Sequence, residues 1–233
     1  MDDNRPRRSA IVSGGSSGIG LAIAARLRER GDRVAVADIM PPPAELGCDF
    51  TPTDVRRQTD VDAFFSACQP LLPTLSTLVC CAGRGVHERL DQGDPRGWSE
   101  IFELNVMGAL RLIRAFVPQL VERRGDVVII GSVAAQRQHP WSGVYNASKA
   151  ALESLAETLR LEMQPEVRVA VISPGVVDTG FFAAMLGAGS DVDSIGYGAL
   201  EAGDVADAAL YALDRPPHAA MNHLTLRPRA QPL

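Results

Sequence analysis

The segment Ser13-Gly14-Gly15-Ser16-Ser17-Gly18-Ile19-Gly20 decides the fold, because it joins a short apolar run, residues 10–13, to a helical pattern, residues 19–30. A sharp turn between a buried strand and an amphipathic helix needs glycine where the backbone turns or approaches another group closely. The glycines here would bring backbone N–H groups and the following helix terminus against an anion such as a diphosphate. The candidate contacts are Gly14, Ser16, Ser17, Gly18, Ile19 and Gly20.

Apolar runs and helical patterns alternate along the rest of the chain. Strands are expected at 33–38, 75–80, 126–131 and 168–173, and helices at 61–72, 98–122 and 144–163. Such alternation predicts an α/β fold in which helices cover both faces of a parallel sheet. We therefore expect residues 1–233 to form a single-domain, Rossmann-type three-layer sandwich with a doubly wound parallel sheet. Residues 1–8 are expected to be a flexible tail, and three consecutive prolines, Pro41 to Pro43, predict a loop between Asp38 and Asp54.

Composition narrows the class of protein further. The chain has 233 residues, 46% hydrophobic and 22% charged, and a net charge of −5 with scattered basic residues, which argues against a nucleic-acid surface. No apolar run approaches the roughly 20 residues that cross a bilayer, and the N-terminus has no long apolar signal region. A cytoplasmic protein that does not enter a membrane is expected. The cysteines and histidines follow no metal-ligand spacing, so no metal site is predicted.

Asp38 ends the second predicted strand, about 18 residues after the last glycine of the loop. An acidic residue there can hold both hydroxyls of a ribose, which favours NAD. The 2′-phosphate of NADP would meet a like charge, at a cost of about 4 kcal/mol per unit of charge at ~4 Å and an effective dielectric of ~20. Arg33 is close enough in sequence to offset that repulsion.

Tyr145 and Lys149 stand four residues apart on the last long helical pattern. An i, i+4 pair lies on one helix face, so the ammonium can favour deprotonation of the phenol. Work near neutral pH requires the tyrosine pKa to fall by roughly 3 units, or about 4 kcal/mol. Lys149 and an oxidised nicotinamide are the expected sources of positive charge.

The glycine loop and the tyrosine–lysine pair resemble the classical short-chain dehydrogenase/reductase family, whose motifs are T-G-x3-G-x-G and Y-x3-K; the resemblance covers nearly the whole chain. It implies an NAD-dependent oxidoreductase that interconverts a secondary alcohol and a ketone by hydride transfer, with Tyr145 as general acid/base. The implied catalytic residues are Asn105, Ser132, Tyr145 and Lys149. Ser132 would polarise the substrate carbonyl, Asn105 would support a water-linked proton path, and Lys149 would also bind the nicotinamide ribose.

The resemblance also implies the remaining cofactor contacts. Asp54-Val55 matches a pair that contacts adenine, with Asp49-Phe50 as a rival after the shortened loop. Cys80-Cys81-Ala82-Gly83 stands where the family has N-N-A-G, so Ala82 and Gly83 are expected at the cofactor and the two cysteines as packing substitutions. Ser17 and Ile39 occupy positions where NADP-preferring relatives often carry a basic residue. Pro174, Gly175, Val177 and Thr179 are expected near the nicotinamide carboxamide.

Residues 181–200 suit a substrate lid because they mix apolar residues with glycines. Their apolar residues Phe181, Phe182, Met185 and Leu186 could line a pocket or form a helix packed on the body, and both alternatives stay open. His139 and Trp141 are candidates for substrate contacts. The partners expected are a small alcohol or ketone and further copies of this chain, in a homotetramer or homodimer through the helices at 98–122 and 144–163. Alternative functions are an NADP-dependent carbonyl reductase and a non-catalytic dinucleotide-binding sensor.

Overall fold

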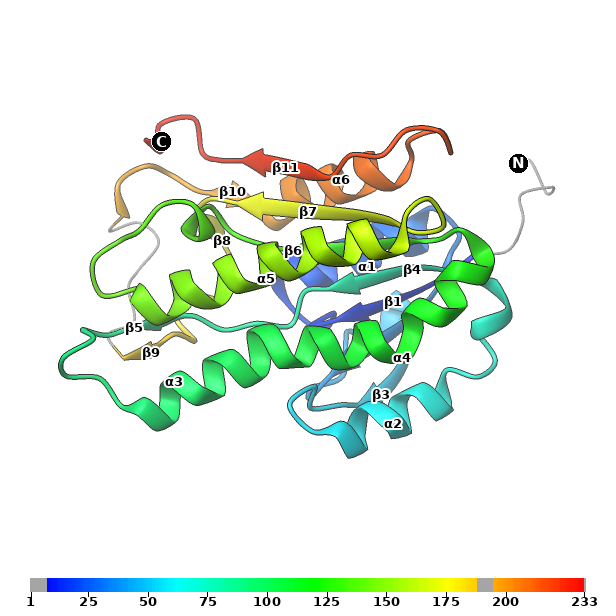
Figure 1. The fold of residues 1–233 in the computed structure, drawn as a ribbon, viewed down its shortest axis with the longest axis horizontal. Helices are drawn as coiled ribbons and strands as arrows, with labels where there is room; N and C mark the ends of the chain where they lie inside the picture. The colour runs from blue at the N-terminus through cyan, green and yellow to red at the C-terminus, as the bar shows by residue number, and fades with distance from the viewer. Residues whose placement is uncertain (1–7, 188–194, 233) are drawn as a thin grey trace.

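Seven parallel strands form one sheet in the computed structural model, which describes residues 8–187 and 195–232 (Figure 1). The order is β11-β7-β6-β4-β1-β2-β3, so the chain runs outward from β1 in both directions and leaves a crevice at the carboxyl ends of β1 and β4. This confirms the predicted doubly wound α/β fold. The strands are β1 (Ser9–Ser13), β2 (Arg33–Asp38), β3 (Asp49–Pro52), β4 (Leu75–Cys80), β6 (Asp126–Ile130), β7 (Arg168–Pro174) and β11 (His223–Leu226).

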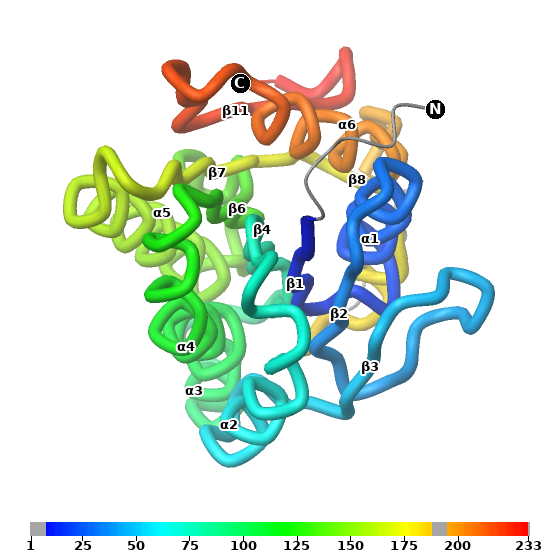
Figure 2. The backbone as a smooth tube through the Cα atoms, turned by 90° about the vertical axis from the view of Figure 1, so that its right-hand side faces the viewer, coloured from blue at the N-terminus to red at the C-terminus, as the bar shows by residue number. Residues whose placement is uncertain are grey.

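Helices cover both faces of the sheet (Figure 2). On one face lie α1 (Gly18–Glu29) and α6 (Ala202–Leu213), and on the other lie α2 (Gln58–Ala67), α4 (Gly108–Arg123) and α5 (Gly143–Met163). Helix α3 (Pro95–Phe102) continues through a π-helical turn, η3 (Glu103–Met107), into α4. The short elements are the 3₁₀ turns η1 (Ala44–Leu46), η2 (Leu72–Thr74) and η4 (Val133–Ala135), and two small ladders that pair β5 (Val86–His87) with β9 (Leu186–Gly187) and β8 (Val177–Asp178) with β10 (Leu200–Glu201).

Strand β1 shows why the strands are almost continuously apolar. Ala10 and Val12 belong to the core beneath α1 and α6, whereas Ile11 belongs to the core beneath α2, α4 and α5. All three side chains are fully buried. Side chains alternate across a strand, so a strand covered on both faces needs apolar residues at every position.

The helical run Pro95–Arg123 is long and apolar enough to cross a membrane by length and composition, with a mean hydropathy of 1.3 in its most apolar window. Half of that window is buried inside the fold, where Leu112, Phe116 and Leu120 pack on the sheet. The buried apolar residues of this run therefore belong to the core.

The loop predicted between Asp38 and Asp54 is wrong in part, because the segment contains η1 and the edge strand β3. The prolines do exclude a helix, but the chain beyond them pairs in parallel with β2, with Ala35 opposite Asp49. Arg33 and Asp49 support that edge with an ion pair at 2.7 Å. Pro52 is tolerated because it ends an edge strand. The sequence pattern also did not predict α6 and β11, which complete the sheet and its covering layer.

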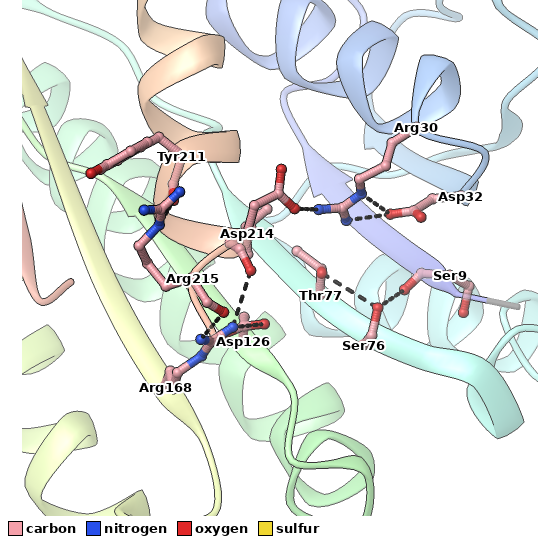
Figure 3. A network of polar contacts seen from close by, with 11 residues as sticks. Ser9, Arg30, Asp32, Ser76, Thr77, Asp126, Arg168, Tyr211, Asp214 and Arg215 are labelled. Carbon is pink, nitrogen blue, oxygen red and sulfur yellow. Dashed lines mark hydrogen bonds and ion pairs between the residues drawn. The ribbon is translucent and has the colours of Figure 1, made fainter. Parts of the chain in front are cut away.

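A polar network lies at the end of the sheet opposite the crevice (Figure 3). Arg168, at the start of β7, donates from Nε and Nη2 to both carboxylate oxygens of Asp126 at 2.6 and 3.1 Å. Its Nη groups also donate to the carbonyls of Leu213, Arg215 and Ala219. One guanidinium thus joins β6, β7 and the segment after α6. At the N-terminus, residues 1–7 of the predicted tail lie outside the described residues, and the Arg8 carbonyl accepts a hydrogen bond from Arg33 N.

Candidate active site

A cavity of about 720 Å³ opens at the carboxyl ends of the central strands. Its size is within the usual range for ligand sites, about 300–1,000 Å³. Of the predicted catalytic and cofactor-binding residues, only Ser16 and Asn105 are absent from its walls. The others line it: Gly14, Ser17, Gly18, Ile19, Gly20, Asp38, Asp54, Val55, Ala82, Gly83, Ser132, Tyr145, Lys149, Pro174, Gly175, Val177 and Thr179.

The glycine loop has the close packing that a diphosphate cradle requires. Gly14 has φ +66°, and a Cβ there would lie 2.9 Å from the backbone of Ala82. Gly18, at φ +49°, begins α1, and Ser17 caps the helix without a side-chain hydrogen bond. The first N–H groups of α1 and the positive end of its dipole therefore face the cavity. These residues fit the diphosphate of a dinucleotide.

Asp38 presents a carboxylate beside this loop. Its Oδ2 accepts from Ser16 N at 3.1 Å and its Oδ1 from Met40 N at 3.3 Å. Ser16 thus holds the Asp38 carboxylate in place through its backbone N–H and does not itself line the cavity. Arg33 is paired with Asp49 at the outer edge of the sheet, and within 8–187 and 195–232 Asp38 forms no ion pair. A cofactor at this end of the cavity would meet an uncompensated negative charge.

Asp54, not its rival Asp49, lies at the cavity wall. The Asp54 carboxylate accepts from Arg56 Nη2 at 2.7 Å and from Arg56 Nε at 2.9 Å. That hydrogen bonding lowers the pKa of Asp54. Arg56 also approaches Glu100 of α3 to 3.8 Å. The Asp54 carboxylate at the cavity wall is therefore paired with a cation, the Arg56 guanidinium.

Lys149 is buried beneath Tyr145, with 6% of its surface exposed. Its Nζ donates to the Ile130 carbonyl at 2.8 Å and lies 5.9 Å from the Tyr145 ring centroid. Burial lowers the pKa of Lys149 to about 8, against the opposing effects of Cys81 and Glu153. An ammonium that titrates near neutrality is thus held at the end of β6.

The pKa of Tyr145 moves in the direction opposite to the expected one. Burial raises the pKa of Tyr145 to about 12, while the hydrogen bond with Ser132 acts to lower it. Lys149 does not reverse the shift, because its nearest acceptor is the Ile130 carbonyl and not the phenol. Ser132 is the N-cap of η4, two residues after the end of β6, and its Oγ accepts from Ala134 N at 3.1 Å. In the protein alone, Tyr145 is a neutral phenol at pH 7.

Asn105 lies in the π-helical turn between α3 and α4 and is 1% exposed. Its Oδ1 accepts from Arg84 N at 2.9 Å, and its Nδ2 donates to the Arg84 carbonyl and to Ser148 Oγ, both at 3.0 Å. Ser148 Oγ in turn donates to the Tyr145 carbonyl at 2.8 Å. Such π turns are rare and often mark functional sites. Asn105 links the segment after β4 to the tyrosine helix, and its water-linked path stays a prediction.

The apolar residues after Thr179 line the cavity and do not form a packed helix. Phe181 lies 5.7 Å from the Tyr145 ring, between ring centroids, and the strand pairing of β9 with β5 fixes the following residues. The wall comprises Phe181, Phe182, Met185 and Leu186. Residues 188–194 of the predicted lid lie outside the described part of the chain. His139 lines the cavity, whereas Trp141 packs against His87 with ring centroids 5.3 Å apart.

Some cavity residues were not among the predicted contacts. Ile39, considered only as a position where NADP-preferring relatives often carry a basic residue, lines the cavity and is 65% exposed directly after Asp38. Gln231 accepts from Val176 N at 3.1 Å through its Oε1 and so supports the Pro174–Val177 segment. Ile39 could have been found from its place beyond a strand end. Gln231 is 55 residues from its partner and gives no local signal.

The thiols beside the cavity have no acidic character. Burial raises the pKa of Cys80 and of Cys81 to about 12 in each case. This agrees with packing roles, because only a thiolate is a good nucleophile or metal ligand. In the described ranges, no group of three or more His, Cys, Asp or Glu side chains is placed to hold a metal ion.

Known proteins share both this sequence pattern and this architecture. A family model described as short chain dehydrogenase matches residues 8–186. An uncharacterized oxidoreductase of Staphylococcus aureus (strain MRSA252) is 30% identical over 229 residues, which cover 94% of this chain and 96% of the relative. An alcohol dehydrogenase from the archaeon Thermococcus sibiricus, complexed with 5-hydroxy-NADP, superimposes with a TM-score of 0.86 at 26% identity, over 98% of this chain and 99% of the other. The closed form of serine dehydrogenase complexed with NADP⁺ gives a TM-score of 0.87 at 26% identity, over 94% of each chain. With the glycine loop, the tyrosine–lysine pair and the sheet order in agreement, this chain belongs to the short-chain dehydrogenase/reductase family of oxidoreductases, which bind a nicotinamide dinucleotide.

Proposed function

We propose that the protein is an NAD-dependent oxidoreductase that interconverts a secondary alcohol and a ketone. The observation that carries the proposal is the common cavity of Ser132, Tyr145 and Lys149 with the glycine loop at the amino end of α1. A dinucleotide-binding sensor has no need of a hydroxyl, a phenol and a buried ammonium in one wall.

The chemistry divides between the cofactor and three side chains. A bound nicotinamide supplies or accepts the hydride. In reduction, the neutral Tyr145 phenol donates its proton to the substrate oxygen, and in oxidation the phenolate takes that proton back. Ser132 donates to the same oxygen and stabilises the charge that develops on it. Lys149 holds positive charge beneath the phenol and favours the phenolate.

The preference for NAD rests on Asp38. Its carboxylate is held by Ser16 N–H and carries no cationic partner among the described residues, so it favours ribose hydroxyls over a 2′-phosphate. An NADP-dependent carbonyl reductase is the second candidate, because two related structures are complexes with NADP⁺ or a derivative of NADP. The two candidates differ in which coenzyme saturates the enzyme at lower concentration.

We also propose a cytoplasmic homo-oligomer. Phe102, Met107 and Leu161 are exposed apolar residues on the α3–α4 run and on α5, the elements expected at the subunit contact. Burial of these side chains against a second copy would remove them from water. Sedimentation of the purified protein measures the assembly.

The function is tested by nicotinamide absorbance with NAD and NADP, supplied in parallel across secondary alcohols, sugars, hydroxy acids and hydroxysteroids. Tyr145→Phe is expected to keep coenzyme binding and to lose about 10²- to 10⁴-fold in turnover, because it removes the proton donor. Tyr211→Phe is the matched control, since Tyr211 is half exposed on α6 and stacks on Arg215 at the opposite end of the sheet. A Tyr145→Phe rate near that of wild type would remove Tyr145 from the mechanism. Tight NADH binding with no turnover on any substrate would instead support a sensor.

A further inference from the structure

Charged side chains divide the cavity into two halves. Its described carboxylates are Asp38, Asp54 and Glu100. Asp38 is bound to the glycine loop, and Asp54 and Glu100 share Arg56 at 2.7 and 3.8 Å. All three therefore belong to the half that the dinucleotide would occupy, between the glycine loop and the C-terminal part of α3.

The half beyond Tyr145 contains a fixed positive charge, the Arg84 guanidinium. The His87 and His139 imidazoles and the apolar wall of Phe181 and Met185 also line this half. No carboxylate from residues 8–187 or 195–232 lines this half, so the fixed charge beside the phenol is positive. A cleft of one sign with low-dielectric walls raises the local concentration of ligands with the opposite sign.

Arg84 is held in place relative to the catalytic tyrosine. Both its backbone N–H and its carbonyl are bound by the Asn105 side chain, which binds Ser148, which binds the Tyr145 carbonyl. Two buried side chains thus bridge the Arg84 backbone to that of Tyr145. This connection gives the pocket a cation at a fixed position from the proton donor.

The Arg84 guanidinium is held by one hydrogen bond and keeps further donors for a ligand. Its Nε donates to the Ala184 carbonyl, and its Nη1 and Nη2 groups form no hydrogen bond with any described residue. A guanidinium fork of this kind suits the two oxygens of a carboxylate. The next residue, Gly85, packs on Met185 and Phe181, where a Cβ would lie 2.9 and 3.1 Å from them. An apolar wall therefore begins directly beside the cation.

We propose that Arg84 binds a carboxylate of the substrate, so that the alcohol is a hydroxy acid and the ketone is the corresponding oxo acid. The inference rests on the proposed function, because it concerns the same cavity and the same reaction. The carboxylate takes no part in the bond changes. The carbinol carbon loses a hydride to oxidised nicotinamide, and its hydroxyl proton passes to the Tyr145 phenolate, which becomes the phenol. The apolar wall contacts the carbon chain.

The test compares each substrate with a partner that lacks the negative charge. Initial rates are measured for 2-hydroxy and 3-hydroxy acids, their methyl esters and their amides, with the coenzyme that saturates the wild-type enzyme. We expect kcat/KM for the acid to exceed that for its ester by about 10- to 100-fold, the range of a hydrogen-bonded charge pair. Phosphate monoesters of secondary alcohols form a third arm, since they share the negative charge.

Arg84→Gln is expected to lower the acid-to-ester ratio of kcat/KM by about 10- to 100-fold, mainly through the KM of the acid. Arg84→Lys should recover part of the ratio, because it restores the charge without the fork. The ratio also cancels any loosening of the Ala184 contact, which affects both substrates alike. Arg89→Gln is the matched control, since Arg89 is exposed, pairs with Asp91 and lies outside the cavity.

Three outcomes would overturn the proposal. They are equal turnover of acids and esters by wild type, an unchanged ratio in Arg84→Gln, and a preference for phosphate monoesters over carboxylates. Turnover of neutral alcohols without a charge preference would leave the proposed function intact and remove only the role of Arg84. Absence of turnover with either coenzyme across all arms would instead count against the proposed function itself.

Discussion

Lys149→Met is expected to abolish turnover and to change how stability depends on pH. Lys149 has an ordinary pKa of 10.5 that burial lowers to about 8. The difference, 10.5 − 8, corresponds to about 3 kcal/mol by which burial penalises the charged form. Below pH 8 the folded protein bears that cost in full. Methionine has a similar length and no charge, so it removes the cost.

The sign follows from proton binding in the two states. Between pH 8 and 10.5, the unfolded chain keeps a proton on Lys149 that the folded chain has released, so the free energy of unfolding rises with pH. The Lys149→Met variant also loses the hydrogen bond to the Ile130 carbonyl, which lowers its stability by about 1–3 kcal/mol. At pH 7 the variant is therefore expected to equal or exceed wild type in stability by up to about 2 kcal/mol. That advantage should shrink by about 3 kcal/mol as the pH reaches 10.5.

The sequence makes this measurement unusually direct, because Lys149 is the only lysine among the 23 basic residues. Lysine labelled with ¹³C at Cε gives one side-chain resonance, whose titration reports the folded-state pKa. Urea unfolding of both proteins at several pH values then gives the stability difference. The pKa values of Cys68, Cys80 and Tyr145 are all raised, so these groups make stability fall with pH, and they do so in both proteins.

A stability difference that stays constant from pH 7 to 10.5 would refute the reasoning, as would a lysine resonance that titrates near 10.5. Either result would mean that the ammonium is well solvated in the folded protein. Turnover and folding are measured on the same purified Lys149→Met sample. The sample must lose turnover while remaining folded, so that unfolding does not explain the loss.

Two further predictions follow from the two ends of the sheet. Asp38→Asn should lower the NAD-to-NADP ratio of kcat/KM by about 10³-fold. Removal of one charge at ~4 Å relieves about 4 kcal/mol of repulsion toward the 2′-phosphate. A ratio within three-fold of wild type would show that Asp38 does not select the coenzyme. Arg168→Met should destabilise the fold by about 3–5 kcal/mol in urea unfolding, because it leaves the Asp126 carboxylate, only 17% exposed, without its bidentate partner. Arg160→Met, which breaks the exposed helical pair with Glu157, is the control and should cost less than about 1 kcal/mol; equal losses in the two variants would contradict the role of Arg168.

Local sequence signals were sufficient for the centre of the fold. The glycine loop, the apolar strand before it and the helix after it all follow from short-range patterns, and the structure places Gly14 at a positive φ against Ala82 as such a loop requires. The same holds for Tyr145 and Lys149, whose spacing on one helix places them together whatever the rest of the chain does. Motifs whose members lie within one turn or one helix could therefore be predicted.

Contacts between distant segments could not be predicted in this way. Strand β3 has little apolar character and exists because β2 offers it an edge to pair with. Gln231 reaches the Pro174–Val177 segment from near the C-terminus. The pKa of Tyr145 depends on burial by surrounding elements and on the hydrogen bond with Ser132, neither of which is visible in Y-x3-K. Spacing predicted which groups meet, but not the protonation state that their surroundings favour.

Lys149 is the only lysine of the chain, and the other 22 basic residues are arginines. Arginine cannot take the place of Lys149 in this site. A guanidinium in its place would stay charged at every accessible pH and would bring a planar fork of five donors into a space where one donor meets the Ile130 carbonyl. An ammonium is compact and can lose its proton when buried, so its pKa responds to burial, to Cys81 and to Glu153. Lys149→Arg should therefore fail as a substitute even though it preserves the charge.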